Sequence, residues 1–183
     1  MNYDYINTYS EEEFEDIQSH YDGKAEYDNG FIFLSSNTPI KHNEIKRNIL
    51  TEFSMYLKGS KCKVYDEQIE VIFKYNDDIR KYKPDIFVMC EDATKKGESF
   101  TSAPKVIFEI LSKSTAKFDK GRKYNTYEKF GVLEYNLVEQ NGFIVQHALI
   151  DGAYEIVNVY KNNDEYISTV FPNLKINLKD IFE

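Results

Sequence analysis

The pattern of apolar and polar positions opens with a short helix and a hairpin. Ser10 followed three residues later by Glu13 is a capping box, which predicts an acidic helix ending near Asp22-Gly23. The segment AEYDNGFIFLSS follows over 25–36, with the Asn29-Gly30 dipeptide near its middle. Because this dipeptide readily adopts the positive φ angles of a two-residue turn, the segment predicts a β-hairpin.

A longer helix is predicted after the hairpin. Apolar residues from Ile45 to Leu57 recur every three or four positions, which is the period of one helix face. Thr38 is a good capping residue and Pro39 suits the first helical position, so we expect the helix to begin there. Gly59 is its expected end.

From residue 61 onward the pattern is dominated by short strands. A single further helix is expected from Ser114-Thr115 to Phe130, with Gly131 as its end. The junctions at Asn141-Gly142 and Asp151-Gly152 have hairpin-turn chemistry, so the last strands should form an antiparallel meander. The predicted strands are rich in Val, Ile, Phe and Tyr and span 61–66, 68–74, 84–90, 104–112, 134–139, 143–150 and 153–160.

Composition narrows the class of protein. The chain has 183 residues, 42% hydrophobic and 30% charged, which is enough apolar material for a packed core. No repeat, low-complexity tract or linker divides it, so we expect residues 1–183 to form one α/β domain with a mixed sheet. Apolar runs stay well below the ~18 residues of a membrane span, and the acidic N-terminus lacks the apolar segment of a secretory signal. We therefore expect a soluble cytoplasmic protein.

Cysteine, histidine and charge patterns exclude some functions and leave others open. Cys62 and Cys90 form neither a CxxC pair nor a disulfide framework, which predicts two reduced, core-packed cysteines. The three histidines lack the spacing of a zinc site. The net charge of −8 argues against a nucleic-acid partner, but the first 30 residues hold nine acids and one lysine, which accounts for all of it. Residues 104–130 carry seven bases and three acids, consistent with a solvated helix face or with phosphate contacts.

Two carboxylates stand out because they lie in otherwise apolar strands. Asp85 opens one strand and Glu109 lies toward the end of another. Buried carboxylates are usually paired or bound to a cation, since desolvation of the charge is unfavourable. A strand cap and a salt bridge are the structural alternative. The next helix, however, carries Asp119, Lys123 and Tyr127 on one face, so an ammonium can project back over the carboxylates. An exposed Asp119–Lys123 pair is the competing interpretation.

Longer strings resemble a known family. PDIFVMC, APKVIFEILSKST and FDKGRKYNTYEKFGVLEYNLVE are similar to the Uma-type family of restriction-endonuclease-like proteins, bacterial members of the PD-(D/E)xK nuclease superfamily. AEYDNGFIF resembles the family's first hairpin, and PIKHNEI resembles the start of its long helix. The resemblance covers about residues 8–182. It implies a restriction-endonuclease-like core in which helices flank a mixed central sheet, with an N-terminal hairpin and a C-terminal antiparallel meander.

The resemblance also implies roles for individual residues. It makes Asp85 and Glu109 the ligands of Mg²⁺ or Mn²⁺, next to the backbone carbonyl of Ile110. The superfamily's usual lysine, two positions after the acid, is Leu111 here, and its role passes to Lys123. Glu26 becomes a further ligand or base, ahead of the alternative acid Glu44. Residues expected to contact or position the substrate are His42, for which packing or capping is the alternative, Ser112, Lys113, Lys117, Lys120, Arg122 and Tyr127.

These assignments predict metal-dependent hydrolysis of phosphodiester bonds, with DNA as the expected substrate and RNA left open. Replacing Lys123 with alanine is expected to abolish cleavage and to move the melting temperature by only a few degrees. The alternative function is a non-catalytic nucleic-acid-binding or assembly module on the same fold. A third interpretation is a structural protein whose acidic N-terminal segment contacts a basic partner. Because double-strand cutting usually needs two sites, a homodimer through an edge of the 133–160 meander is a further expectation.

Overall fold

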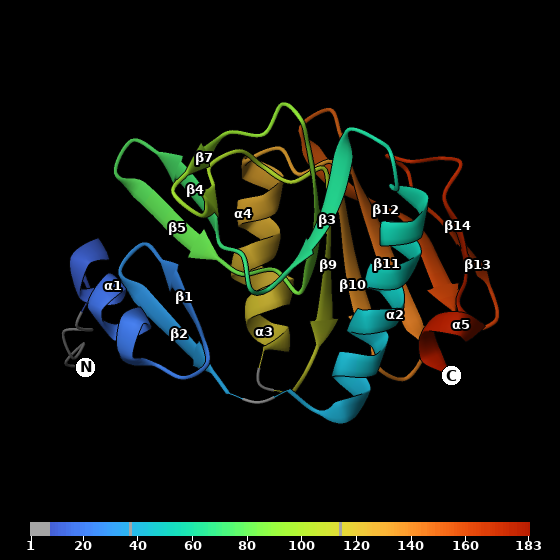
Figure 1. Ribbon diagram of the computed structural model, residues 1–183, viewed down its shortest axis with the longest axis horizontal. Coiled ribbons are helices and arrows are strands. Elements are labelled where there is room, and N and C mark those ends of the chain that lie inside the picture. The colour runs from blue at the N-terminus through green and yellow to red at the C-terminus, as the bar shows by residue number, and fades with distance from the viewer. Residues whose placement is uncertain (1–7, 37, 114) are drawn as a thin grey trace, which may run out of the picture.

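The computed structural model describes residues 8–36, 38–113 and 115–183 (Figure 1). Its helices are α1 (Glu11–His20), α2 (Ile40–Tyr56), α3 (Ala116–Phe118), α4 (Tyr124–Lys129) and α5 (Lys179–Phe182), with the π-helical turn η1 (Asp119–Lys123) joining α3 to α4. Its strands are β1 (Lys24–Asp28), β2 (Phe31–Ser35), β3 (Cys62–Asp66), β4 (Val71–Tyr75), β5 (Asp78–Tyr82), β6 (Ile86–Cys90), β7 (Lys95–Lys96), β8 (Ser99–Phe100), β9 (Val106–Leu111), β10 (Glu134–Glu139), β11 (Phe143–Ile150), β12 (Ala153–Lys161), β13 (Glu165–Ile167) and β14 (Lys175–Asn177).

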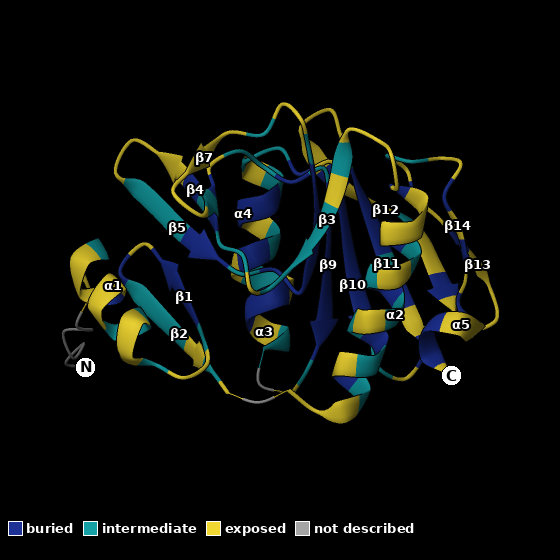
Figure 2. Cartoon of the chain, viewed as in Figure 1, coloured by how far each residue is buried: buried dark blue, intermediate teal, exposed yellow. Residues whose placement is uncertain are grey.

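A mixed sheet lies at the centre of the molecule, as the sequence predicts. Its strand order is β12-β11-β10-β9-β6-β3, in which β9 and β10 are parallel and the other neighbours antiparallel. Figure 2 shows β9 and β10 buried along almost their whole length. A second six-stranded sheet, of order β2-β1-β5-β4-β8-β7, extends the predicted hairpin and was not expected.

The segment from α3 to α4 packs between the two sheets. Tyr127 of α4 lies with its ring centroid 5.5 Å from Phe73 of β4 and 5.1 Å from Tyr135 of β10. Phe118 of α3 meets Tyr82 of β5 at 5.5 Å. This aromatic layer fixes the helix against both sheets, so side chains from β1, β9 and the helix can reach one another.

The opposite face of the central sheet is covered by α2, α5 and the β13–β14 hairpin (Figure 1). Ile45 and Phe53 of α2, Phe108 of β9 and Tyr166 of β13 belong to one continuous buried apolar cluster. Because α2 is held along its length by this cluster, its first turn is fixed beside the ends of β6 and β9.

Most of the predicted elements are confirmed. Ser10 and Glu13 form the capping box at α1, and the β1–β2 turn has φ of 48° at Asn29 and 95° at Gly30. The meander β10–β11–β12 is antiparallel throughout. The predicted cap of the long helix is wrong, because α2 begins at Ile40 after Pro39, and the Thr38 hydroxyl accepts a hydrogen bond from the Asn43 side chain instead.

Two local features were not predicted. Strand β5 has the sequence DIRKY, whose three charged residues hide its strand character. The predicted 115–130 helix is interrupted by η1, and its proposed start at Ser114 lies outside the described residues. A π-turn inserts one extra residue into a helix and is often found at functional sites. Here it turns both Asp119 and Lys123 into the interior.

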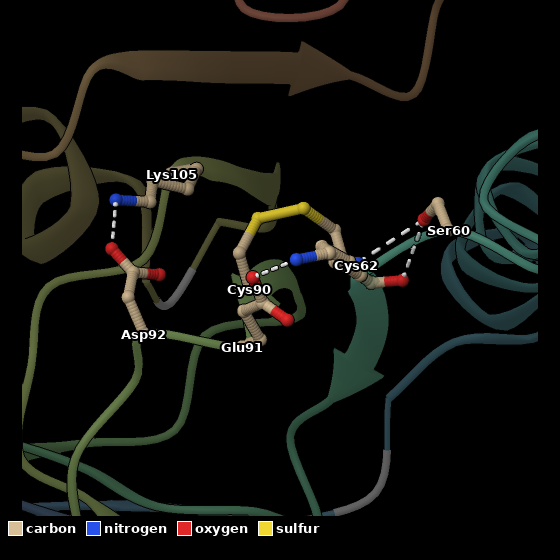
Figure 3. The surroundings of a disulfide bond; sticks show 7 residues. Ser60, Cys62, Cys90, Glu91, Asp92 and Lys105 are labelled. Carbon is tan, nitrogen blue, oxygen red and sulfur yellow. Dashed lines mark hydrogen bonds and ion pairs between the residues drawn. A yellow bond between two sulfur atoms is a disulfide. The ribbon is translucent and has the colours of Figure 1, made fainter.

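The prediction of two reduced cysteines is wrong. Cys62 of β3 and Cys90 of β6 lie directly opposite each other in the antiparallel register and form a disulfide (Figure 3). They are 28 positions apart in the sequence, and the strand pairing brings them together. Among the residues that the structure describes, no helix is both long enough and apolar enough to cross a membrane.

Candidate active site

Asp85 and Glu109 lie side by side because of the pairing of β6 with β9. Ile86 is opposite Phe108 in this antiparallel register, which places the residue before β6 next to Glu109. The main-chain amide of Asp85 is 3.4 Å from Glu109 Oε2. Asp85 is 6% exposed and Glu109 is 1% exposed. The two carboxylates thus meet in the interior, as predicted.

Lys123 projects from η1 onto three carboxylates. Its Nζ lies 2.9 Å from Glu109 Oε1, 3.0 Å from Glu26 Oε1 and 3.4 Å from Asp119 Oδ1. Its side chain is 1% exposed. The Tyr127 hydroxyl donates a second hydrogen bond, of 2.8 Å, to Glu109 Oε1. The predicted helix face is therefore real, and it points inward rather than to solvent.

Asp85 is held by three further groups. Its Oδ2 accepts a 2.8 Å hydrogen bond from the Ile110 amide and lies 3.1 Å from His42 Nε2. Its Oδ1 accepts a 3.0 Å hydrogen bond from Lys24 Nζ. Lys24 was not singled out from the sequence. Because residues two apart in a strand share a face, its position two residues before Glu26 was the available signal.

Burial and neighbouring charges set the protonation of the site. Burial, which is the largest influence, and the nearby negative charge of Asp85 raise the pKa of Glu109 to about 8, although the Lys123 ammonium acts to lower it. Burial also works against ionisation of Asp85, but Lys24 and His42 outweigh it and hold the pKa of Asp85 below its usual value. The pKa of Lys123 is raised, because Glu109 and Glu26 more than offset its burial. Two carboxylates with opposite shifts are typical of functional sites.

The carboxylates open into a cavity of about 600 Å³. His42, Ser112 and Lys113 line it together with Asp85 and Glu109. A second cavity of about 560 Å³ adjoins it, and the residues common to both are Lys24, Ser35, Ser36, Thr38 and Asp85. Asp85 therefore lies where the two cavities meet, within reach of a substrate that extends into both.

Other residues expected near a substrate lie farther from the cavity. Lys120 is exposed and pairs with Glu139 at 3.3 Å. Arg122 pairs with Asp28 at 2.7 Å and lines a separate small cavity. Tyr127 is fully buried, so it can position Glu109 but not touch a substrate. Lys117 is exposed, and neither it nor Glu44 is among the residues that line the 600 Å³ cavity.

The donor set fits a hard divalent cation that keeps most of its water. Within the described ranges, no group of three or more His, Cys, Asp or Glu side chains is placed to hold a metal ion. Mg²⁺ does not require one, because it usually takes one or two carboxylates and completes its shell with water and substrate phosphates. Asp85 and Glu109 provide those two carboxylates, and the cavity provides the room.

Comparisons with known proteins point to one family. The model of the Uma2 family, described as "Putative restriction endonuclease", matches residues 11–179. Two proteins from Synechocystis sp., "Uncharacterized protein slr1290" and "Uncharacterized protein sll1609", are 29% and 24% identical to this chain over 146 and 127 residues. These matches cover 77% and 68% of this chain and 74% and 71% of the relatives.

A solved structure from Anabaena variabilis, described as a putative nuclease belonging to DUF820, superposes with a TM-score of 0.71 at 16% identity. The superposition covers 92% of this chain and 96% of that one. The predicted restriction-endonuclease-like fold is thereby confirmed. The family match supports a nuclease-like function and hence interaction with nucleic acid.

Proposed function

Because the chain belongs to the Uma2 family, we propose that it is an endonuclease that hydrolyses the phosphodiester bonds of DNA with Mg²⁺ or Mn²⁺. One observation carries the proposal: the buried pair Asp85 and Glu109 faces a cavity, with the Lys123 ammonium 2.9 Å from Glu109. When bound there, the cation would supply Lewis-acid stabilisation of the scissile phosphate and of the attacking water.

The residues around the carboxylates prepare them for this role. The Ile110 amide and His42 hold Asp85 Oδ2, which fixes the orientation of a carboxylate that lines both cavities. Tyr127 and Lys123 hold Glu109 Oε1 in the same way. Such fixed ligands need little rearrangement during the reaction, which is how preorganised sites lower a barrier.

Lys123 is itself held by carboxylates. Its Nζ forms ion pairs with oxygens of Glu26, Glu109 and Asp119, and it donates a hydrogen bond to Glu109 Oε1. A positive charge so placed can stabilise the negative charge that develops on phosphate during hydrolysis. At the rim of the cavity, Lys113 provides a further charge for the substrate backbone, and such contacts weaken with salt.

A non-catalytic nucleic-acid-binding module is the second candidate. Leu111 stands where the superfamily's usual lysine would be, and the Lys123 ammonium is already ion-paired with three carboxylates of the protein. A protein of this second kind would bind DNA without cutting it.

Cleavage of pooled substrates separates the two functions. The purified protein would be incubated with Mg²⁺ or Mn²⁺ and with random-sequence duplex DNA, single-stranded DNA or RNA. We expect cleavage of DNA by the wild type, loss in Asp85→Asn and Glu109→Gln, and retention in the control Asp92→Asn. Asp92 is an exposed carboxylate that pairs with Lys105 outside the site. DNA binding without cleavage in the wild type, or equal cleavage in Asp85→Asn, would overturn the proposal.

A further inference from the structure

Lys24 contacts the Oδ1 oxygen of Asp85, and both residues line both cavities. Its Nζ is 3.0 Å from Asp85 Oδ1, and its side chain is 18% exposed. Across the described ranges, no other hydrogen bond or ion pair reaches this oxygen. The proposed mechanism does not use Lys24, so its place at the centre of the site requires an explanation.

The remaining oxygens of the carboxylate pair differ in how many partners they have. Asp85 Oδ2 has two partners, and Glu109 Oε1 also has two. Among the residues that the structure describes, Glu109 Oε2 is hydrogen-bonded only to the Asp85 amide, at the long distance of 3.4 Å. The two oxygens with room for a cation are therefore Asp85 Oδ1 and Glu109 Oε2, and the first is held by the Lys24 ammonium.

The net charge of the side chains around these oxygens also favours a cation at this position. Four carboxylates (Glu26, Asp85, Glu109 and Asp119) surround two ammonium groups, those of Lys24 and Lys123, so 4 − 2 leaves two negative charges once Glu109, whose pKa is raised to about 8, has lost its proton. A divalent cation balances this excess. Once it is bound at Asp85, the cation and the Lys24 ammonium would repel each other at close range.

We propose that Lys24 occupies the cation position in the metal-free protein and becomes a contact for substrate phosphate when a cation displaces it. This inference rests on the proposed metal-dependent function. Lys24 lines both cavities, so its ammonium can leave Asp85 without leaving the site. The anion available to it there is the phosphate backbone of the bound nucleic acid.

The proposal couples two binding events. Metal frees Lys24 for the substrate, so metal strengthens DNA binding, and by linkage DNA strengthens metal binding by the same factor. An alternative role, in which Lys24 only holds Asp85 in place, predicts the opposite effect on the metal, since loss of Lys24 would then disorganise the ligand.

Calorimetric titration of Mn²⁺ tests whether Lys24 competes with the cation for Asp85. Lys24→Met and Lys24→Gln are compared with the wild type, after thermal melting has shown that each is folded; the glutamine variant can still hydrogen-bond to Asp85. The control is Lys83→Met, which removes a positive charge from the second cavity but keeps the main-chain amide that binds Glu26. We expect both Lys24 variants to bind Mn²⁺ about tenfold more tightly than the Lys83 control, because a bound competitor has been removed.

Fluorescence anisotropy with a labelled DNA duplex tests whether the displaced Lys24 contacts the substrate. Lys24→Met should weaken DNA binding when Ca²⁺ is present and have little effect in a chelator, whereas Lys83→Met should weaken it equally in both. Equal or weaker Mn²⁺ affinity in the Lys24 variants, or the same DNA-binding loss with and without Ca²⁺, overturns the inference while the metal site stands. Absence of Mn²⁺ binding in every protein, wild type included, overturns the metal-dependent function and this inference together.

Discussion

Replacement of Lys123 by methionine tests the electrostatic account of the site through stability. The substitution keeps most of the side-chain volume and removes the positive charge that contacts Glu26, Glu109 and Asp119. Removing one partner of a buried ion pair typically destabilises a protein by about 3–5 kcal/mol, because the other charge stays buried and unpaired. In a chain of this length, that loss lowers the melting temperature by roughly 6–20 °C.

The control is Lys120→Met, three positions earlier in the same turn. Lys120 forms an ion pair with Glu139, and their side chains are 51% and 40% exposed, respectively. Such surface ion pairs contribute about 0.2–1 kcal/mol to the free energy of unfolding. Urea denaturation of both variants gives the two free energies of unfolding. A second variant that combines Lys123→Met with Glu109→Gln should recover part of the loss, since the glutamine carries no charge to leave unpaired.

The structure thus changes the expectation drawn from the sequence, that removal of Lys123 shifts the melting temperature by only a few degrees. Lys123 is 1% exposed, so its removal leaves buried carboxylates without their cationic partner. A loss for Lys123→Met within about 1 kcal/mol of the Lys120→Met value would refute the reasoning, because it would show that the three carboxylates do not depend on this charge.

Three further predictions concern the fold and the site. Both carboxylate oxygens of Glu134 accept hydrogen bonds from the 166–170 segment and β11. Glu134→Gln should therefore lower the free energy of unfolding by about 3 kcal/mol or more, whereas the control Glu165→Gln, at an exposed ion pair, should lower it by less than about 1 kcal/mol. Equal urea midpoints for the two variants would contradict this. Reduction of the Cys62–Cys90 disulfide, which closes a loop of 28 residues, should lower stability by about 3.5 kcal/mol, and unchanged melting after reduction would count against the bond. Because the pKa of Glu109 is raised to about 8, a proton competes with the metal, so Mn²⁺ affinity measured by calorimetry should rise with pH up to that value and then level off; a flat profile would exclude Glu109 as a ligand.

Local patterns in the sequence were sufficient for much of the fold. The Asn29-Gly30 turn and the Ser10 capping box depend on neighbouring residues only, and both are observed. Period-two and helical patterns likewise located the strands of the central sheet and both long helical segments. Strand β5 was not predicted, because its charged residues hide the strand pattern and are stabilised by ion pairs with other elements, as Arg80 is with Asp28. A charged strand of that kind cannot be recognised before its partners are known.

In the candidate site, too, some residues could be predicted from local sequence patterns and others could not. Asp85, Glu109 and Lys123 stand out because each is a charge within a local apolar or helical pattern. Lys24 could not be assigned in this way, because its contact with Asp85 joins residues 61 positions apart. The Cys62–Cys90 pairing was missed for the same reason, since it follows from the register of β3 against β6. Long-range register is the information that the one-dimensional pattern lacks.

Binding of a divalent cation at Asp85 and Glu109 is the central claim, and Mn²⁺ titration by calorimetry tests it without knowledge of the substrate sequence. The titration would compare the wild type with Asp85→Asn and with the exposed control Asp92→Asn, alone and with a short DNA duplex. We predict saturable binding of about one or two ions per chain in the wild type and the control, and loss of binding in Asp85→Asn. Equal binding in all three proteins, or no binding in any of them even with the duplex, would contradict the claim.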